Sequence, residues 1–235
     1  MNYKLLILFW VFTRLGLGQE TVYFFPGQGS DERLFTEFKL DKRFIKVVIS
    51  YPVPSKEDDM RSFALRLIKQ IDQSKPYSFV GVSMGGMLIS ELMDTLSPRT
   101  AIIISSAKCS SELPSRYRFQ RVFPLNKIVP KRMIKGGARM LQPLVEPDRK
   151  QHKETFKAML KSKTPEYYKR TVNLIVNWEK KDYSDKLIHI HGDGDHTLPI
   201  DKVCEDIVIP KGSHMMALTQ GPFLNRLVLS IIEMD

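Results

Sequence analysis

The chain has 235 residues and carries 36 lysines and arginines against 26 acidic residues, for a net charge of +10. Its hydrophobic content of 43% and charged content of 26% are typical of a globular domain and exclude a long disordered or low-complexity protein. Two cysteines, Cys109 and Cys204, are too few for a disulfide framework, and their sequence context indicates no metal site. The sequence leaves open whether these two cysteines pair.

The first 18 residues, MNYKLLILFWVFTRLGLG, have the pattern of a secretory signal. An early lysine precedes an apolar run at 5–12, and small residues at 16 and 18 suit cleavage. The apolar run is too short to span a bilayer as a helix. We therefore expect residues 1–18 to direct export to the periplasm or out of the cell. If they instead form a buried first strand, the protein is cytoplasmic.

Strand and helix patterns alternate along the rest of the chain. The predicted strands are the apolar runs at 21–25, 44–50, 77–82, 100–106, 186–192 and 206–210. Helical spacing of apolar residues predicts helices at about 58–73, 84–96 and 215–234. This alternation, with strands that are mostly apolar, predicts an α/β fold with a mostly parallel central sheet of about six strands flanked by helices.

One long segment, residues 108–182, interrupts this alternation after the fourth strand. Its predicted helices are at 119–129, 131–141, 148–162 and 165–178. We expect it to form a helical lid above the sheet, inserted into a core made of residues 19–107 and 183–235. The segment holds 19 basic and 7 acidic residues, so it carries all of the surplus positive charge. That surplus indicates either solvated faces of amphipathic helices or contact with an anionic substrate or an acidic surface.

The sequence Gly81-Val82-Ser83-Met84-Gly85 lies between the third strand and the following helix. A G-x-S-x-G turn in this context is the pattern of a nucleophilic serine, because small flanking residues allow a sharp turn that lifts the hydroxyl above the sheet. The backbone N–H of Met84, at the start of the helix, then becomes a candidate oxyanion donor. We therefore predict Ser83 as a catalytic nucleophile.

A serine nucleophile needs a base and an acid that orients the base. The chain has five histidines: His152, His189, His191, His196 and His214. Only His214 lies in the loop after the sixth strand, where the base is expected, and the pair on the fifth strand is predicted to be structural. Asp193 and Asp195 both follow the fifth strand, so either could supply the acid.

The acid loop resembles that of the α/β-hydrolase superfamily, which often reads His-Gly-x-x-Asp-x-x-x-Pro. His191-Gly192, Asp195 and Pro199 match this spacing, and the resemblance extends from about residue 21 to the end of the chain, apart from the lid. It implies that Asp195 is the catalytic acid and leaves Asp193 as the alternative.

The same resemblance bears on the loop after the first strand, where family members commonly have His-Gly. This chain has Pro26-Gly27-Gln28, which places the backbone N–H of Gln28 in the position of the second oxyanion donor. The Gln28 side chain could add a further donor. Gly27 and His196 are candidates for substrate contact.

These residues predict a serine hydrolase that cleaves a carboxylic ester or thioester, with no cofactor or metal. The expected partner is a small acyl substrate, with no nucleic acid, and the oligomeric state is left open. Two alternatives remain at this stage. One is other chemistry of the same fold, such as C–C hydrolysis, lyase or perhydrolase activity. The other is a binding protein that has the fold without the activity.

Overall fold

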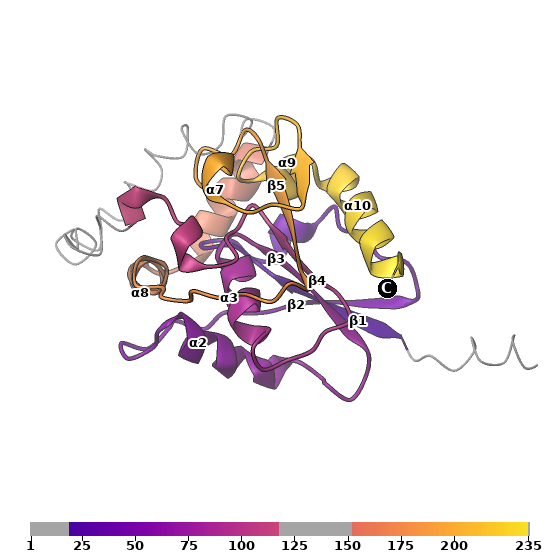
Figure 1. Cartoon of the computed structure of the whole chain (residues 1–235), viewed down its shortest axis with the longest axis horizontal. Helices are drawn as coiled ribbons and strands as arrows, with labels where there is room; N and C mark the ends of the chain where they lie inside the picture. Colours follow the sequence, from indigo (N-terminus) through magenta and orange to yellow (C-terminus); the bar gives the residue numbers. More distant parts are fainter. Residues whose placement is uncertain (1–18, 118–151, 235) are drawn as a thin grey trace, which may run out of the picture.

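A computed structural model describes residues 19–117 and 152–234 of the chain. Its centre is a six-stranded sheet (Figure 1). The strands are β1 (Glu20–Phe25), β2 (Phe44–Val48), β3 (Tyr77–Val82), β4 (Ala101–Ile104), β5 (Leu187–Gly192) and β6 (Ile207–Ile209). They lie in the order β2-β1-β3-β4-β5-β6, and every neighbouring pair is parallel. The predicted α/β fold with a parallel sheet is therefore confirmed.

Helices cover both faces of this sheet. The α-helices are α2 (Met60–Leu67), α3 (Met84–Leu92), α7 (Lys153–Ser162), α8 (Pro165–Val176), α9 (Met216–Thr219) and α10 (Gly221–Met234). Short 3-10 turns occur at Glu32–Phe35, Ile68–Gln70, Ser110–Glu112 and Ile200–Lys202. In Figure 1, α2, α3 and α8 lie on one side of the sheet and α10 lies on the other.

Each face has its own apolar core, and alternate residues of one strand contribute to both cores. In β1, Tyr23 and Phe25 pack on the side of α2, α3 and α8, whereas Val22 and Phe24 pack on the side of α7, α9 and α10. Successive side chains of a strand point to opposite faces, so a strand covered on both faces is mostly apolar, and its polar side chains need partners. All residues of β1, β3 and β4 are buried, as this arrangement requires.

Three helices differ from the sequence-based expectation, and the one predicted at 84–96 already ends at Leu92. The helix predicted at 58–73 begins at Met60, ends at Leu67 and continues only as the 3-10 turn Ile68–Gln70. The helix predicted at 215–234 is divided at Gln220 into α9 and α10. Pro222 explains the division, because a proline has no N–H to donate and fits only the first turn of a helix.

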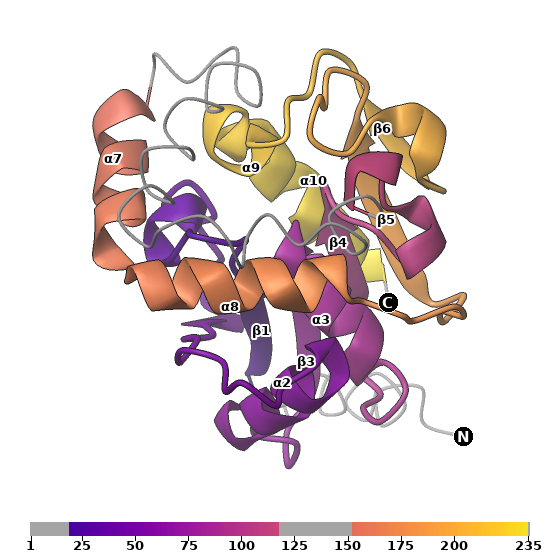
Figure 2. The ribbon, with the colours of Figure 1, turned by 90° about the vertical axis from the view of Figure 1, so that its left-hand side faces the viewer.

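Two of the helices predicted in the lid segment are observed. The helices expected at 148–162 and 165–178 correspond to α7 and α8, and Thr164 caps α8 by accepting a hydrogen bond from the backbone N–H of Tyr167 (3.1 Å). Figure 2 shows α8 passing across the front of the sheet and α3. The helices predicted at 119–129 and 131–141, and the expected signal at 1–18, lie outside the described residues.

Within the part of the chain that the structure describes, no helix is both long enough and apolar enough to cross a membrane.

Candidate active site

The turn from β3 into α3 holds Ser83 in an unusual backbone conformation. Its φ is 53° and its ψ is −121°, values that L-residues rarely adopt. The surrounding structure fixes this strained turn, because the Ser83 N–H donates to the carbonyl of Ile104 (3.0 Å) and its carbonyl accepts from the Ser106 hydroxyl (2.7 Å). The residue therefore stands at the carboxyl edge of the sheet, between the strand and the helix.

The turn depends on Gly85, where helix α3 approaches the end of β1. A Cβ atom at this position would lie 2.1 Å from the carbonyl oxygen of Phe25, far inside van der Waals contact with a backbone atom. Only glycine allows α3 to begin this close to the sheet. The second glycine of the predicted G-x-S-x-G motif is therefore required by this close contact with β1.

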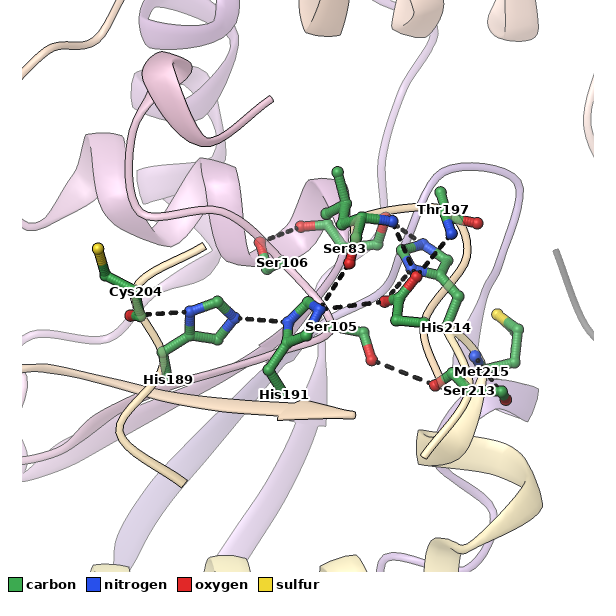
Figure 3. Close-up of polar contacts among 12 residues, drawn as sticks. Ser83, Ser105, Ser106, His189, His191, Thr197, Cys204, Ser213, His214 and Met215 are labelled. Carbon is green, nitrogen blue, oxygen red and sulfur yellow. Dashed lines mark hydrogen bonds and ion pairs between the residues drawn. The ribbon is translucent and has the colours of Figure 1, made fainter. Parts of the chain in front are cut away.

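The structure brings three of the predicted side chains into one hydrogen-bonded chain (Figure 3). His214 Nε2 lies 3.0 Å from Ser83 Oγ, and His214 Nδ1 lies 2.8 Å from Asp195 Oδ2. The three residues come from the loops that follow β3, β5 and β6, whose carboxyl ends meet at one edge of the sheet. The imidazole is therefore placed to take a proton from the serine while the carboxylate holds it in position.

Asp195 is buried, with 3% of its surface exposed, and both of its carboxylate oxygens accept hydrogen bonds. Oδ1 accepts from the backbone N–H groups of Thr197 and Leu198, each at 2.8 Å, and Oδ2 faces His214. Burial by itself would raise the pKa of Asp195, but the nearby His214 and these hydrogen bonds outweigh burial, so the pKa lies below its ordinary value. The carboxyl group is therefore ionised at neutral pH.

The loops that carry the acid and the base are packed directly against each other. A Cβ atom at Gly192 would lie 2.1 Å from the carbonyl oxygen of Gly212, and that carbonyl accepts a hydrogen bond from the N–H of Gly194 (3.0 Å). This close approach of two backbones fixes the distance between Asp195 and His214. It also explains the glycine in the His-Gly pair that the sequence analysis matched to the superfamily motif.

The side chain of the alternative acid, Asp193, bonds to the backbone of Lys211 and does not pair with His214 as Asp195 does. The Asp193 side chain is exposed, and its Oδ1 accepts a hydrogen bond from the backbone N–H of Lys211 (2.5 Å). The structure therefore brings Asp195, and not Asp193, to His214. His196, a candidate for substrate contact, is also exposed on this loop.

The loop after β1 lies beside the serine on the other side. A Cβ atom at Gly27 would be 3.4 Å from the Cβ of Ser83, so the loop is in contact with the turn. The amide of the Gln28 side chain donates to Thr171 Oγ1 on α8 (2.9 Å). This bond uses one of the two N–H donors of the amide, so the expectation that the side chain could add an oxyanion donor stays a prediction. The backbone N–H groups of Gln28 and Met84 are the other candidates for that role.

No protein-family model and no curated protein matches the sequence of this chain. Solved structures do match. A lipase-esterase related protein from Clostridium acetobutylicum is 12% identical, with a TM-score of 0.66, over 91% of this chain and 94% of its own. An esterase from Thermogutta terrifontis is 15% identical (TM-score 0.67, covering 93% of this chain and 90% of its own). An enol-lactonase from Burkholderia xenovorans is 12% identical (TM-score 0.70, covering 94% of both chains).

The chain has the α/β-hydrolase fold. The predicted resemblance to the superfamily is thus confirmed at the level of the fold, over almost the whole length of these neighbours. At 12–15% identity the neighbours do not decide which reaction the chain performs, so the function must be argued from its own residues.

One contact of this site was not predicted from the sequence. His189 and His191 were expected to be structural residues of β5, and both are fully buried. His191 nevertheless reaches the site, since its Nε2 lies 2.8 Å from the carbonyl of Leu198 and 3.5 Å from Asp195 Oδ2. The His-x-His spacing on a strand was the signal available, because residues two apart point to the same face.

Proposed function

We propose that the protein is a serine hydrolase that cleaves a carboxylic ester or thioester through an acyl-enzyme. The observation that carries the proposal is the contact chain from Ser83 Oγ through His214 to Asp195, with distances of 3.0 and 2.8 Å. A serine hydroxyl is a weak nucleophile until a base within hydrogen-bond reach can take its proton, and this arrangement provides that base.

In the first half of the reaction, Ser83 Oγ attacks the carbonyl carbon of the substrate as its proton passes to His214 Nε2. The ionised Asp195 holds the imidazole by its Nδ1–H and stabilises the imidazolium that forms. The tetrahedral intermediate then breaks its bond to the leaving alcohol or thiol, which takes the proton from His214. A water molecule repeats these steps on the acyl-enzyme and regenerates Ser83.

The backbone N–H groups of Met84 and Gln28 are the proposed donors to the oxyanion. Met84 begins α3, where the first N–H groups have no partner within the helix and the helix dipole favours negative charge. Gln28 lies in the loop whose neighbour, Gly27, contacts the serine turn. The tie between the Gln28 side chain and Thr171 supports the role, because it fixes the loop against α8 while the backbone remains available.

The substrate is proposed to enter between this edge of the sheet and the segment 108–182, which would act as a lid. Support comes from α8, which lies over the sheet and contacts the loop after β1 through the Gln28–Thr171 hydrogen bond. The segment's surplus of positive charge favours an anionic acyl substrate or a peripheral contact with an acidic surface. Two neighbours of the fold are named as an esterase and an enol-lactonase, both of which act on an acyl–oxygen bond.

The proposal is tested with a fluorophosphonate probe and a series of p-nitrophenyl esters of increasing acyl length. Wild-type protein should be labelled at Ser83 and release p-nitrophenol, and Ser83→Ala should do neither. Ser230→Ala, which changes an exposed serine on α10, is the matched control and should behave as the wild type. Labelling without ester or thioester turnover would point to another reaction of this fold. Absence of labelling in the folded protein would exclude the enzyme altogether.

A further inference from the structure

A buried pair of histidines lies beside the Asp195 carboxylate, where His191 approaches the same oxygen, Oδ2, as His214 does. The rings of His189 and His191 lie on β5 with 0% exposure, and their centroids are 4.9 Å apart at nearly perpendicular orientation. Figure 3 shows the two rings in line between Cys204 and the site. The proposed mechanism does not use either ring, so their arrangement requires its own explanation.

Three polar contacts run along this line. His189 Nδ1 lies 3.3 Å from the carbonyl oxygen of Cys204, His189 Nε2 lies 3.0 Å from His191 Nδ1, and His191 Nε2 lies 2.8 Å from the carbonyl oxygen of Leu198. Each contact needs one proton to be a hydrogen bond. A neutral imidazole carries one ring proton, so two neutral rings supply only two protons for the three contacts. One contact must therefore lack a proton.

The contact distances indicate which of the three contacts lacks a proton. Two acceptors repel each other most at the shortest separation, so this criterion assigns the first proton to the 2.8 Å contact to Leu198 and the second to the 3.0 Å contact between the rings. The 3.3 Å contact to Cys204 is then the one without a proton. Both rings therefore carry their proton on Nε2, and His189 donates to His191 Nδ1.

We propose that His191 is a positioning residue of the triad, whose Nε2–H is shared between the Leu198 carbonyl and the carboxylate of Asp195. The Asp195 Oδ2 atom lies 3.5 Å from this nitrogen, beyond an ordinary hydrogen bond, so the Leu198 carbonyl is the main acceptor and the carboxylate a weak second one. His189 sets the required tautomer of His191 by occupying its Nδ1. This inference rests on the proposed function, since it assigns a task toward the proposed catalytic acid.

The groups that face the pair keep both rings neutral. Burial lowers the pKa of His189, to about 3, and His191 and Lys108 lower it further, against an opposing effect of Asp206 and the Cys204 carbonyl. Burial also lowers the pKa of His191, with His214 acting in the same direction and Asp195, Glu205 and the Leu198 carbonyl opposing it. A neutral donor orients the carboxylate without cancelling the negative charge that His214 needs.

The tautomers can be tested in the wild-type protein by nitrogen-15 NMR of labelled histidine side chains at neutral pH. We expect both His189 and His191 to show a protonated Nε2 and an unprotonated Nδ1. A protonated Nδ1 at His191 would overturn the proposal, because its Nε2 would then carry a lone pair toward Leu198 and Asp195. This measurement requires no substrate, so it decides the inference even if the protein hydrolyses no ester.

The positioning role is tested by a matched pair of variants, His191→Gln and His191→Met, in ester hydrolysis. Glutamine keeps an N–H donor near the Nε2 position, whereas methionine fills a similar volume without a donor. For His191→Met, kcat should fall about tenfold with KM unchanged, because the buried Leu198 carbonyl loses its donor and the loop that holds Asp195 is less firmly fixed. The acidic limb of its kcat/KM profile should move upward by about half a pH unit, because the carboxylate then acts more strongly on the imidazolium.

His191→Gln should restore most of the activity and the wild-type pH profile. A purely structural role predicts otherwise, since loss of packing would lower the amount of folded protein without moving the pH profile. The proposal is therefore overturned if folded His191→Met retains the wild-type kcat and profile, or if His191→Gln is impaired as severely as His191→Met. If wild-type protein itself shows no turnover, the proposed function fails, and the NMR result alone decides the tautomers.

Discussion

Replacing His189 with glutamine should remove part of the protein's sensitivity to mild acid. In the unfolded chain a histidine has a pKa of about 6.5, whereas burial beside His191 and Lys108 lowers the pKa of His189 in the folded protein to about 3. Between these values the unfolded state binds a proton at this residue and the folded state does not. The free energy of unfolding therefore falls as the pH falls from 6.5 toward 3 and is fully retained above 6.5.

The size of the effect follows from the difference in proton binding. At pH 5 this histidine is protonated in the unfolded chain and neutral in the folded protein. The pH then lies 1.5 units below the unfolded pKa of about 6.5, so at about 1.4 kcal/mol per unit the free energy of unfolding falls by about 2 kcal/mol. Glutamine can still donate to His191 Nδ1 but does not titrate in this range. His189→Gln should therefore lose about 2 kcal/mol less than the wild type between pH 7.5 and pH 5.

Urea unfolding of both proteins at the two pH values measures this double difference, from which any packing defect of the variant cancels. The carboxylates with lowered pKa values, such as Asp195, weaken both proteins equally in acid and also cancel. If the two proteins lose stability in parallel between pH 7.5 and 5, the buried, neutral state of His189 is refuted.

Three further outcomes are expected. Gly85→Ala should lower the free energy of unfolding by about 2 kcal/mol or more, because its Cβ would overlap a backbone oxygen of β1, and a change below 0.5 kcal/mol in urea would contradict the close contact. Asp195→Asn should lower kcat/KM by about 10³–10⁴, whereas Asp193→Asn should stay within about twofold in the same assay. Trp178→Phe should cost about 1.5–3 kcal/mol in thermal unfolding, since its indole N–H donates to the buried Glu91 carboxylate (2.7 Å); an unchanged midpoint would argue against that bond.

Most of the fold could be predicted from local sequence patterns. The runs that became β1, β3 and β4 are mostly apolar because helices cover both of their faces, and this is visible in the sequence. The positions of Ser83, Asp195 and His214 after β3, β5 and β6 could be predicted in the same way, since parallel strands bring their carboxyl ends to one edge. Motif spacing favoured Asp195 over Asp193, and the structure agrees in bringing it to His214.

Contacts between segments that are far apart in the sequence could not be predicted from local patterns. The hydrogen bond from Gln28 to Thr171 joins residues 143 positions apart, and no local sequence pattern predicts it. The contact between His191 and Asp195 depends on how the acid loop folds back over β5, which the Leu198 carbonyl fixes. The division of the last helix could have been found, because Gly221-Pro222 stands at the break.

The chain order of the site has a consequence for its assembly. Ser83 and His214 are hydrogen-bonded although 131 residues separate them, and the strand that leads to the base, β6, is the last of the sheet. If β1, β3 and β4 form before β6, the strained serine turn is in place without its hydrogen-bond partner His214. The contact chain from Ser83 to Asp195 would then be complete only once β6 has docked on β5.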